Sequence, residues 1–235
     1  MLKKFLVCGL AAITFAAGMA YAGEPEIRKA AASIGLMADE VRKVEPLGLY
    51  EVRIGDDLWY ADEKGNYLIR GDIIDVKAKA NLTETRRSKL AQIKFSDLPL
   101  ELAVKTVRGN GKRVFATFED PNCGYCKKLA KDMVSMNDIT MYTFMLPILS
   151  ADSGEKSRAI WCASDRSKAW SDWMVNGAAP AAANCAAPND KVMALAQKYK
   201  IHGTPTIFLA NGERIPGAVP AARLEQDLNR VASAK

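Results

Sequence analysis

The spacing of apolar and polar residues changes character near the middle of the chain. In the first half, residues 26–41 are helix-favouring but interrupted by Gly35, which predicts a short helix ending near this glycine. Residues 49–54 then alternate apolar and polar side chains, as in a half-buried strand. Further strand-like runs, separated by turn residues, are 58–61, 67–69 and 73–76. We expect a small antiparallel sheet with one helix.

The second half alternates strand-like and helix-like segments from Lys112 onward. Residues 113–118 and 139–146 are nearly continuous β-favouring runs, as expected of strands buried on both faces. A third strand, 206–209, leads into a hairpin at Asn211-Gly212. The segments with helical composition are 123–136, 157–165, 169–174, 191–199 and 221–231. This alternation indicates an α/β unit, so the whole chain is expected to be α+β.

A charged segment separates the two halves. Residues 81–95 carry only a thin apolar stripe at Leu82, Leu90 and Ile93, which indicates a solvent-exposed connecting helix. An ordinary surface helix packed on one domain is the alternative. The expected organisation is an N-terminal domain at 23–80, a linker helix at 81–97 and a second domain at 98–235.

The first residues resemble an export signal. Lys3 and Lys4 precede an apolar run, and Ala20-Tyr21-Ala22 is a small-residue cleavage site, so we expect residues 1–22 to be a cleaved signal peptide. An uncleaved membrane anchor is the alternative. No later apolar run reaches the roughly 18 to 20 residues that a membrane span needs, so stable membrane insertion is not expected.

The charge balance excludes some partners. Without the two lysines of the signal, 31 basic residues face 27 acidic ones, a net charge of +4 spread along the chain. This is too small and too scattered to indicate nucleic acid or an anionic membrane surface. Four cysteines remain in the expected mature chain, in a compartment that permits disulfides.

The most informative motif is Cys123-Gly124-Tyr125-Cys126, placed where a buried strand ends and a helix begins. Unpaired backbone N–H groups and the helix dipole at such a position stabilise a thiolate over a thiol. Cys123, at the very start, is therefore the predicted attacking nucleophile. Cys126, deeper in the first turn, is the predicted resolving thiol.

Three other interpretations of this motif are weaker. A zinc site would need a second C-x-x-C or paired histidines, and His202 is the only histidine. An inert disulfide in so small a ring would be strained and would add little stability. Chance occurrence in a protein without redox chemistry is the third. No metal or other cofactor is expected.

A second motif, Gly203-Thr204-Pro205-Thr206, lies directly before a predicted strand. Together with the C-x-x-C helix it resembles the thioredoxin superfamily, in which a cis-proline turn faces the motif cysteines. The resemblance implies that Thr204 and Pro205 contact an extended substrate segment next to Cys123. His202 is expected to shape this turn rather than to catalyse.

The resemblance narrows to one family. FEDPNCGYCKKL, AIWCA around Cys162, Cys185 after an Ala-rich loop, GTPT and NGERIPGAVP together resemble the DsbC/DsbG family of periplasmic thiol:disulfide interchange proteins, nearer the DsbC type. The specific motifs lie in the second half of the chain. This resemblance implies a cystatin-like N-terminal dimerisation domain, a linker helix and a thioredoxin-like catalytic domain with a helical insertion.

One position departs from thioredoxin. Thr117 occupies the place where thioredoxin has a buried acid, six residues before the first motif cysteine. Glu119 and Asp120 are nearer, but both precede Pro121 and are expected to be turn residues. We therefore assign no general base from the sequence.

Cys162 and Cys185 are expected to form a structural disulfide rather than a second redox pair. Neither has a partner at C-x-x-C spacing, and Cys162 falls in an apolar helical stretch. A loop of this length would contribute roughly 3 kcal/mol by restricting the unfolded chain. Tryptophans 161, 170 and 173 are expected to pack in the core or between helices.

These observations predict an enzyme that rearranges or reduces non-native disulfides in exported proteins. The resemblance implies unfolded or misoxidised exported proteins as clients, a DsbD-like membrane reductase as electron donor, and a homodimer. Two alternatives stay open: a monomeric thiol oxidase or reductase with the same cysteines, and a largely non-catalytic periplasmic chaperone.

Overall fold

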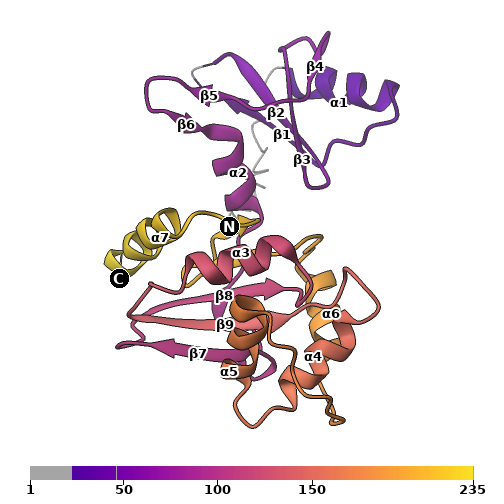
Figure 1. Cartoon of the computed structure of the whole chain (residues 1–235). Coiled ribbons are helices and arrows are strands. Elements are labelled where there is room, and N and C mark those ends of the chain that lie inside the picture. Colours follow the sequence, from indigo (N-terminus) through magenta and orange to yellow (C-terminus); the bar gives the residue numbers. More distant parts are fainter. Residues whose placement is uncertain (1–22, 46, 235) are drawn as a thin grey trace, which may run out of the picture. The chain divides into compact units, whose positions relative to one another are not determined.

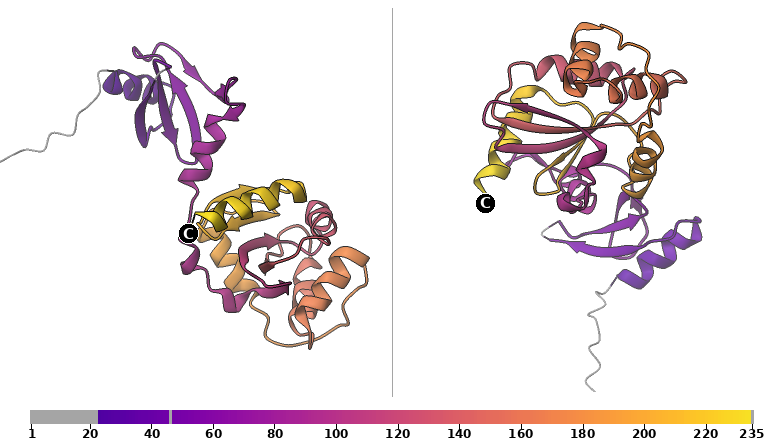
Figure 2. Two further views of the ribbon diagram at one scale, coloured as in Figure 1. Left: turned by 90° about the vertical axis from the view of Figure 1, so that its left-hand side faces the viewer. Right: turned by 90° about the horizontal axis from the view of Figure 1, so that it is seen from below.

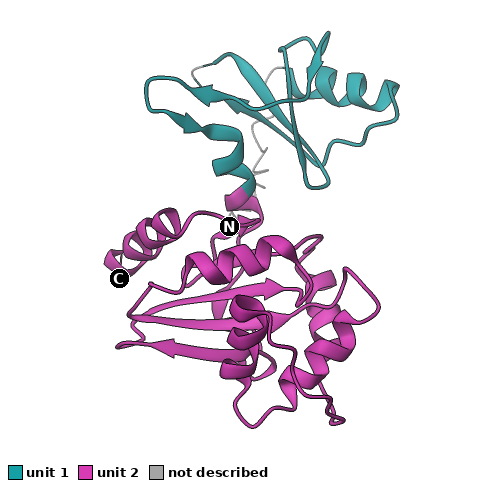
Figure 3. Cartoon of the chain, viewed as in Figure 1, with its two compact units in different colours: residues 1–87 teal, residues 88–235 magenta. Residues whose placement is uncertain are grey.

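The computed structural model describes residues 23–45 and 47–234 and divides the chain into two compact units (Figure 3). Unit 1 comprises residues 1–87 and unit 2 residues 88–235. The predicted signal peptide, 1–22, lies outside the described residues. In the part of the chain that is described, no helix is both long and apolar enough to cross a membrane.

Unit 1 is a helix packed on a small antiparallel sheet. The helix is α1 (Glu24–Ser33), and the sheet runs in the order β1-β2-β3-β4 (Figure 1). The strands are β1 (Glu40–Val44), β2 (Leu49–Ile54), β3 (Asp57–Ala61) and β4 (Leu68–Ile69). The core between helix and sheet is small and consists of Ile27, Val41, Tyr50, Val52 and Ala61.

Two details of unit 1 differ from the sequence prediction. β1 lies where the sequence indicated only helix and loop, because its pairing with β2 outweighs its charged composition. The run at 73–76 does not continue the main sheet. Instead β5 (Ile74–Asp75) pairs with β6 (Ala80–Asn81) as a separate hairpin.

Helix α2 (Leu82–Leu90) is held to unit 1 at its first turns. The hydroxyls of Tyr60 and buried Thr83 lie 2.6 Å apart, and Arg86 donates to Glu51 (Nε···Oε1 2.9 Å), whose side chain is only 3% exposed. The segment after α2 packs on unit 2, where Ile93 N–H donates to Gly212 O (3.1 Å). The start of the predicted connector therefore belongs to unit 1 and its end to unit 2.

Unit 2 is built on a five-stranded mixed sheet in the order β11-β10-β8-β9-β7. The central pair β8 and β9 is parallel, and every other neighbouring pair is antiparallel. The strands are β7 (Val104–Arg108), β8 (Arg113–Glu119), β9 (Ile139–Met145), β10 (Thr206–Leu209) and β11 (Arg214–Pro216). Two short 3₁₀ turns, η1 (Phe95–Asp97) and η2 (Leu100–Leu102), precede β7.

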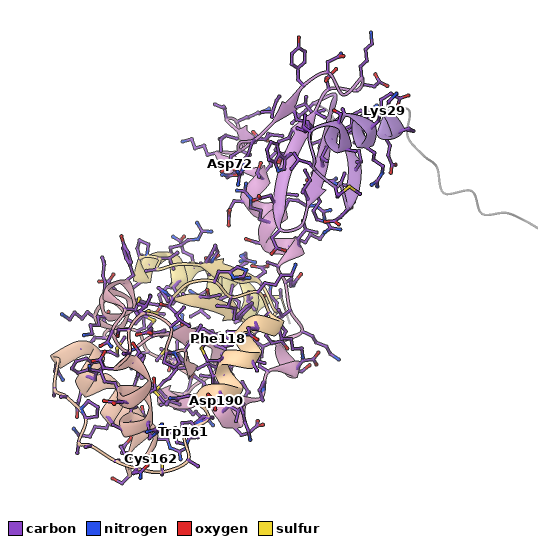
Figure 4. The ribbon with its side chains drawn as sticks, turned by 90° about the vertical axis from the view of Figure 1, so that its right-hand side faces the viewer. Lys29, Asp72, Phe118, Trp161, Cys162 and Asp190 are labelled. Carbon is purple, nitrogen blue, oxygen red and sulfur yellow. A yellow bond between two sulfur atoms is a disulfide. The ribbon has the colours of Figure 1, made fainter. Side chains whose placement is uncertain are left out.

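Helices cover both faces of this sheet (Figure 2). α3 (Gly124–Asp132) and α7 (Ala221–Ser233) pack on one face around Phe115, and α6 (Asn189–Lys198) packs on the other around Phe118. Phe118 lies in the interior of the unit, whereas Cys162 lies toward its edge (Figure 4). The helical insertion comprises α4 (Ser153–Trp161), α5 (Arg166–Ser171) and the π-helix η3 (Asp172–Asn176).

The predicted fold class is confirmed: a small antiparallel sheet with a helix, followed by an α/β unit with a helical insertion. The sequence did not predict β7. This strand is an edge strand that pairs only with β9, and its alternation of exposed and buried residues is short.

Candidate active site

The C-x-x-C motif begins α3 directly after the central strand β8. Cys123 is the N-cap residue, and its Sγ accepts a hydrogen bond from Cys126 N–H (3.1 Å). The Cys123 sulfur thus caps the N-terminus of α3, as a Ser or Asp side chain does in other helices. It lies at the positive end of the helix, where a thiolate is stabilised. Cys123 is 3% exposed and Cys126 is fully buried.

The turn before β10 meets the same sulfur. The Cys123 thiol donates to the backbone carbonyl of Thr204 (Sγ···O 3.4 Å), and the Thr204-Pro205 peptide bond is cis. β10 pairs with β8, so the ends of these strands bring residues 204–205 beside residue 123. The structure therefore brings together Cys123, Cys126, Thr204 and Pro205, which are 78 or more residues apart between the two motifs.

The two cysteines have different surroundings. Burial raises the pKa of the Cys126 thiol far above its usual value, and the nearby Glu119 carboxylate and the hydrogen bond with Cys123 raise it further. The Cys126 thiol therefore stays protonated until a base removes the proton or the thiol reacts with another sulfur. Gly124 and Tyr125 lie between the cysteines, and Tyr125 is 72% exposed.

The expectation that both acids before the motif are turn residues is wrong for Glu119, whereas Asp120 does begin a turn, in which Cys123 N–H donates to Asp120 O (3.0 Å). Glu119 is the last residue of β8, Asp120 follows it, and both are fully buried. The backbone N–H groups of Ile148 and Leu149 donate to Asp120 Oδ2 (2.8 and 2.9 Å). Its Oδ1 accepts from Asn122 N–H (2.7 Å) and from the Ser153 hydroxyl (2.8 Å).

Asp120 therefore fixes the loop that leads into Cys123. With four donors its carboxylate is fully satisfied although it is buried. The same carboxylate ties this loop to the start of α4 and to the segment after β9. The local rule that an acid before proline is a turn residue missed this role, because three of the four donors come from Ile148, Leu149 and Ser153, far along the chain.

Trp173 supports the motif from the helical insertion. Its indole Nε1–H donates to Pro121 O (2.6 Å), and the ammonium groups of Lys127 and Lys156 lie 4.1 and 5.1 Å from its ring centroid. Trp170 and Met174 of the insertion belong to the same buried cluster as the two motif cysteines. The sequence predicted that the tryptophans pack, but not that they do so beside the active-site motif.

Cys162 and Cys185 are joined by a disulfide with their Cα atoms 5.9 Å apart. Cys162 ends α4, and Cys185 lies in the exposed Ala-rich loop. The bond closes the segment that contains α5 and η3. His202 is exposed in the turn before Thr204. Within the described ranges, no group of three or more His, Cys, Asp or Glu residues is arranged to hold a metal ion.

A C-x-x-C pair at a helix N-terminus opposite a cis-proline turn, on a mixed sheet, is the arrangement of a thioredoxin-like domain. Residues 100–232 match the family model for a thioredoxin-like domain. Residues 18–84 match that of the disulfide bond isomerase protein N-terminal domain. The two matches correspond to the two halves that the sequence pattern separates.

Named relatives narrow the class. The chain is 51% identical over 183 residues to a probable thiol:disulfide interchange protein DsbC of Bordetella pertussis, covering 78% of this chain and 66% of that protein. It is 30% identical over 233 residues to the thiol:disulfide interchange protein DsbC of Escherichia coli K12, covering 97% and 96%. A disulfide interchange protein from Neisseria gonorrhoeae has 39% identity and a TM-score of 0.55, covering 57% of this chain and 97% of that chain. This chain belongs to the DsbC family.

Proposed function

We propose that this protein exchanges and rearranges disulfides in other exported proteins, with Cys123 as nucleophile and Cys126 as resolving thiol. The observation that carries the proposal is the position of Cys123 Sγ, which lies at the N-terminus of α3 and 3.4 Å from the carbonyl of Thr204. Membership of the DsbC family and the thioredoxin-like fold support it.

The reaction begins when the Cys123 thiolate attacks one sulfur of a client disulfide. The client S–S bond breaks, the other client sulfur leaves as a thiolate, and a mixed disulfide joins Cys123 to the client. Isomerisation is completed when a different client thiolate attacks this mixed disulfide and frees Cys123. When no client thiol does so, Cys126 attacks Cys123 Sγ, releases the reduced client and leaves the Cys123–Cys126 disulfide.

Residues next to Cys123 would hold the client. We assign Thr204 and Pro205 to backbone pairing with an extended client segment, as in β-strand addition. Exposed apolar side chains support the binding of unfolded chains: Tyr125 within the motif, and Ile148 and Leu149 on the segment bonded to Asp120. Such exposed groups fit a partner that is itself partly unfolded and apolar.

The test is refolding of a substrate with scrambled disulfides by single-cysteine variants. Cys123→Ala should abolish rescue, and Cys126→Ala should accumulate a client joined to Cys123 on non-reducing gels. Full isomerase activity of Cys123→Ala would overturn the proposal. Suppression of aggregation of a cysteine-free client by Cys123→Ala would instead reveal a separate chaperone function.

Unit 1 would serve self-association, giving a homodimer. It matches the isomerase N-terminal family model, and its own core consists of only a few residues. Large apolar side chains stay exposed on it, including Tyr67, Ile74 and Val76, the last of these 83% exposed. Two copies would present two active sites to one client and raise its effective concentration.

Light scattering of the mature chain tests this assignment, with a dimer expected at micromolar concentration. A fragment from Ser88 onward keeps the bond from Ile93 to Gly212 and should be monomeric, reduce a small disulfide, and lose most isomerisation of unfolded proteins. A monomeric full chain would favour a monomeric oxidase or reductase.

The proposed site of action is the periplasm, after removal of residues 1–22. The features of that segment and the Cys162–Cys185 bond both suit an oxidising compartment. A membrane reductase of the DsbD type would keep Cys123 and Cys126 reduced. Trapping of Cys126→Ala with cell membranes, followed by mass spectrometry, identifies such a partner.

A further inference from the structure

An unpaired buried carboxyl lies under the active-site helix. Glu119 is fully buried, and neither of its oxygens has a hydrogen-bond partner at normal geometry within the described residues. The hydroxyls of Thr117 and Thr143 are also buried and unpartnered. A buried polar group in this condition costs stability, so its retention calls for a role.

Strand register places Glu119 on the same face as Cys126. In the parallel pair, Thr117 lies opposite Thr143 and Glu119 opposite Met145. Because side chains alternate along strands, these four residues point to one face of the sheet. Met145 packs in the cluster that contains Cys126. The Glu119 carboxyl therefore shares the buried layer beneath α3 with the resolving thiol.

The two groups also interact electrostatically. Burial raises the pKa of Glu119 to about 8, an effect that the neighbouring Thr117 hydroxyl partly opposes. A negative charge on Glu119 in turn raises the pKa of Cys126. Neutral Glu119 and neutral Cys126 are favoured together, so the protons of the two groups are coupled. A carboxyl that titrates near neutral pH is well suited to proton transfer.

Other charged groups nearby are committed elsewhere. Asp120 is bonded to four donors. Lys127 on α3 and Lys156 on α4 lie over the Trp173 ring. Apolar residues from β7, β9 and the insertion form one buried cluster with Cys126, namely Val104, Met145, Ile160, Trp161, Trp170 and Met174. Besides Cys123, Glu119 is the titratable group whose charge acts on Cys126.

We propose that Glu119 accepts the proton of the Cys126 thiol during resolution and returns it when the Cys123–Cys126 disulfide is reduced. The inference rests on the proposed function and assigns it the base that the sequence did not reveal. Transfer takes place directly or through one water.

The proton moves in opposite directions during resolution and during reduction. In resolution, the Glu119 carboxylate takes the Cys126 proton as Cys126 Sγ attacks Cys123 Sγ; the bond from Cys123 to the client breaks, and the client sulfur leaves as a thiolate. In reduction, a donor thiolate attacks Cys123 Sγ, Cys126 leaves as a thiolate, and the Glu119 acid protonates it. A second donor thiolate then attacks the donor sulfur of this mixed disulfide, which frees Cys123 as a thiolate and leaves the donor as a disulfide. After reduction the proton is on Cys126, and the Glu119 carboxylate takes up another proton from solvent.

Stopped-flow reaction with 5,5′-dithiobis(2-nitrobenzoate) separates the two sulfur steps. The first thionitrobenzoate released reports attack by Cys123, and the second reports resolution by Cys126, which Cys126→Ala removes. We expect the wild-type resolution rate to rise with pH and to level off above about pH 8. Glu119→Gln should slow resolution roughly 100-fold near neutral pH, abolish this inflection and leave the first release unchanged.

Thr143→Val is the matched control, since it removes a buried unpartnered hydroxyl from the same face without removing a titrating group. It should keep the wild-type rates and pH profile. Resolution by Glu119→Gln with the wild-type rate and profile overturns the inference and leaves the proposed function standing. Absence of the first release in wild type overturns the proposed function itself.

A measurement on unmutated protein covers the case in which Glu119→Gln does not fold. In protein labelled with ¹³C at the glutamate carboxyls, one carboxyl should titrate near pH 8 by NMR, and its midpoint should move when Cys123 and Cys126 are oxidised. Titration of every glutamate below about pH 6 in both redox forms overturns the inference.

Discussion

Unit 2 contains two cysteine pairs that lie in very different surroundings. Cys123 and Cys126 lie three positions apart at a helix start, are buried, and share their layer with an unpaired acid. Cys162 and Cys185 lie 23 positions apart and join the end of α4 to an exposed loop. In the proposed function the first pair is the reactive dithiol, and the second pair is a structural tether.

The tether also builds the environment of the reactive pair. The segment closed by Cys162 and Cys185 carries α5 and η3, whose Trp170 and Met174 lie in one buried cluster with the motif cysteines. Trp173 from the same segment bonds to Pro121, just ahead of the motif. A structural disulfide can therefore influence redox chemistry by holding Trp170, Trp173 and Met174 in place beside the motif.

The largest expected difference between the pairs is in activity. Cys123→Ala should lower the rate of disulfide exchange by at least about 1,000-fold, since it removes the nucleophile. The double variant Cys162→Ala/Cys185→Ala should still release the first thionitrobenzoate at close to the wild-type rate. Loss of that first step in the folded double variant would show that the second pair takes part in exchange.

The next largest effect is on stability, to which the Cys162–Cys185 pair should contribute more than the Cys123–Cys126 pair. Loss of the Cys162–Cys185 bond should lower the free energy of unfolding by about 3 kcal/mol, because a loop of more than twenty residues is no longer closed in the unfolded chain. Cys126 should also alkylate faster, since the segment that carries α5 and η3 is no longer tethered. Urea unfolding at one protein concentration measures the first effect. An unchanged midpoint would refute the tether.

A smaller effect concerns pH. The folded-state pKa of Glu119, about 8, lies above the ordinary value of 4.5, so the folded protein binds one more proton than the unfolded chain between these values. Stability should therefore fall as pH rises through this window, by about 2 kcal/mol between pH 6 and 8. Glu119→Gln should remove this slope. An equal slope in both proteins, with the dithiol reduced, would place the titrating group elsewhere.

Much of the fold was predictable because local signals agreed with the final packing. β8 and β9 are continuous β-favouring runs, and the C-x-x-C helix begins directly after the first of them. Two of the strands that the sequence did not predict, β1 and β7, are edge strands of their sheets. Their backbone partners lie on other segments, so pairing rather than local composition determines them.

The site residues, too, divide into those that the sequence predicted and those that it did not. Cys123, Cys126, Thr204 and Pro205 belong to short motifs whose residue types reveal their chemistry. Glu119 does not, because an acid two positions before a proline has the local appearance of a turn residue. Its burial follows from its register opposite Met145, and its coupling to Cys126 follows from the packing of α3 on that face. Neither is visible in a single sequence.

The measurement that tests the account most directly is a titration of the oxidised protein with a glutathione redox buffer, followed by alkylation and mass spectrometry of all four cysteines. We expect Cys123 and Cys126 to become reduced first, with Cys123 captured in mixed disulfides, while Cys162–Cys185 stays intact, because structural disulfides have lower reduction potentials than reactive C-x-x-C pairs. Reduction of both pairs over the same range, or capture of glutathione on Cys162 or Cys185, would contradict it.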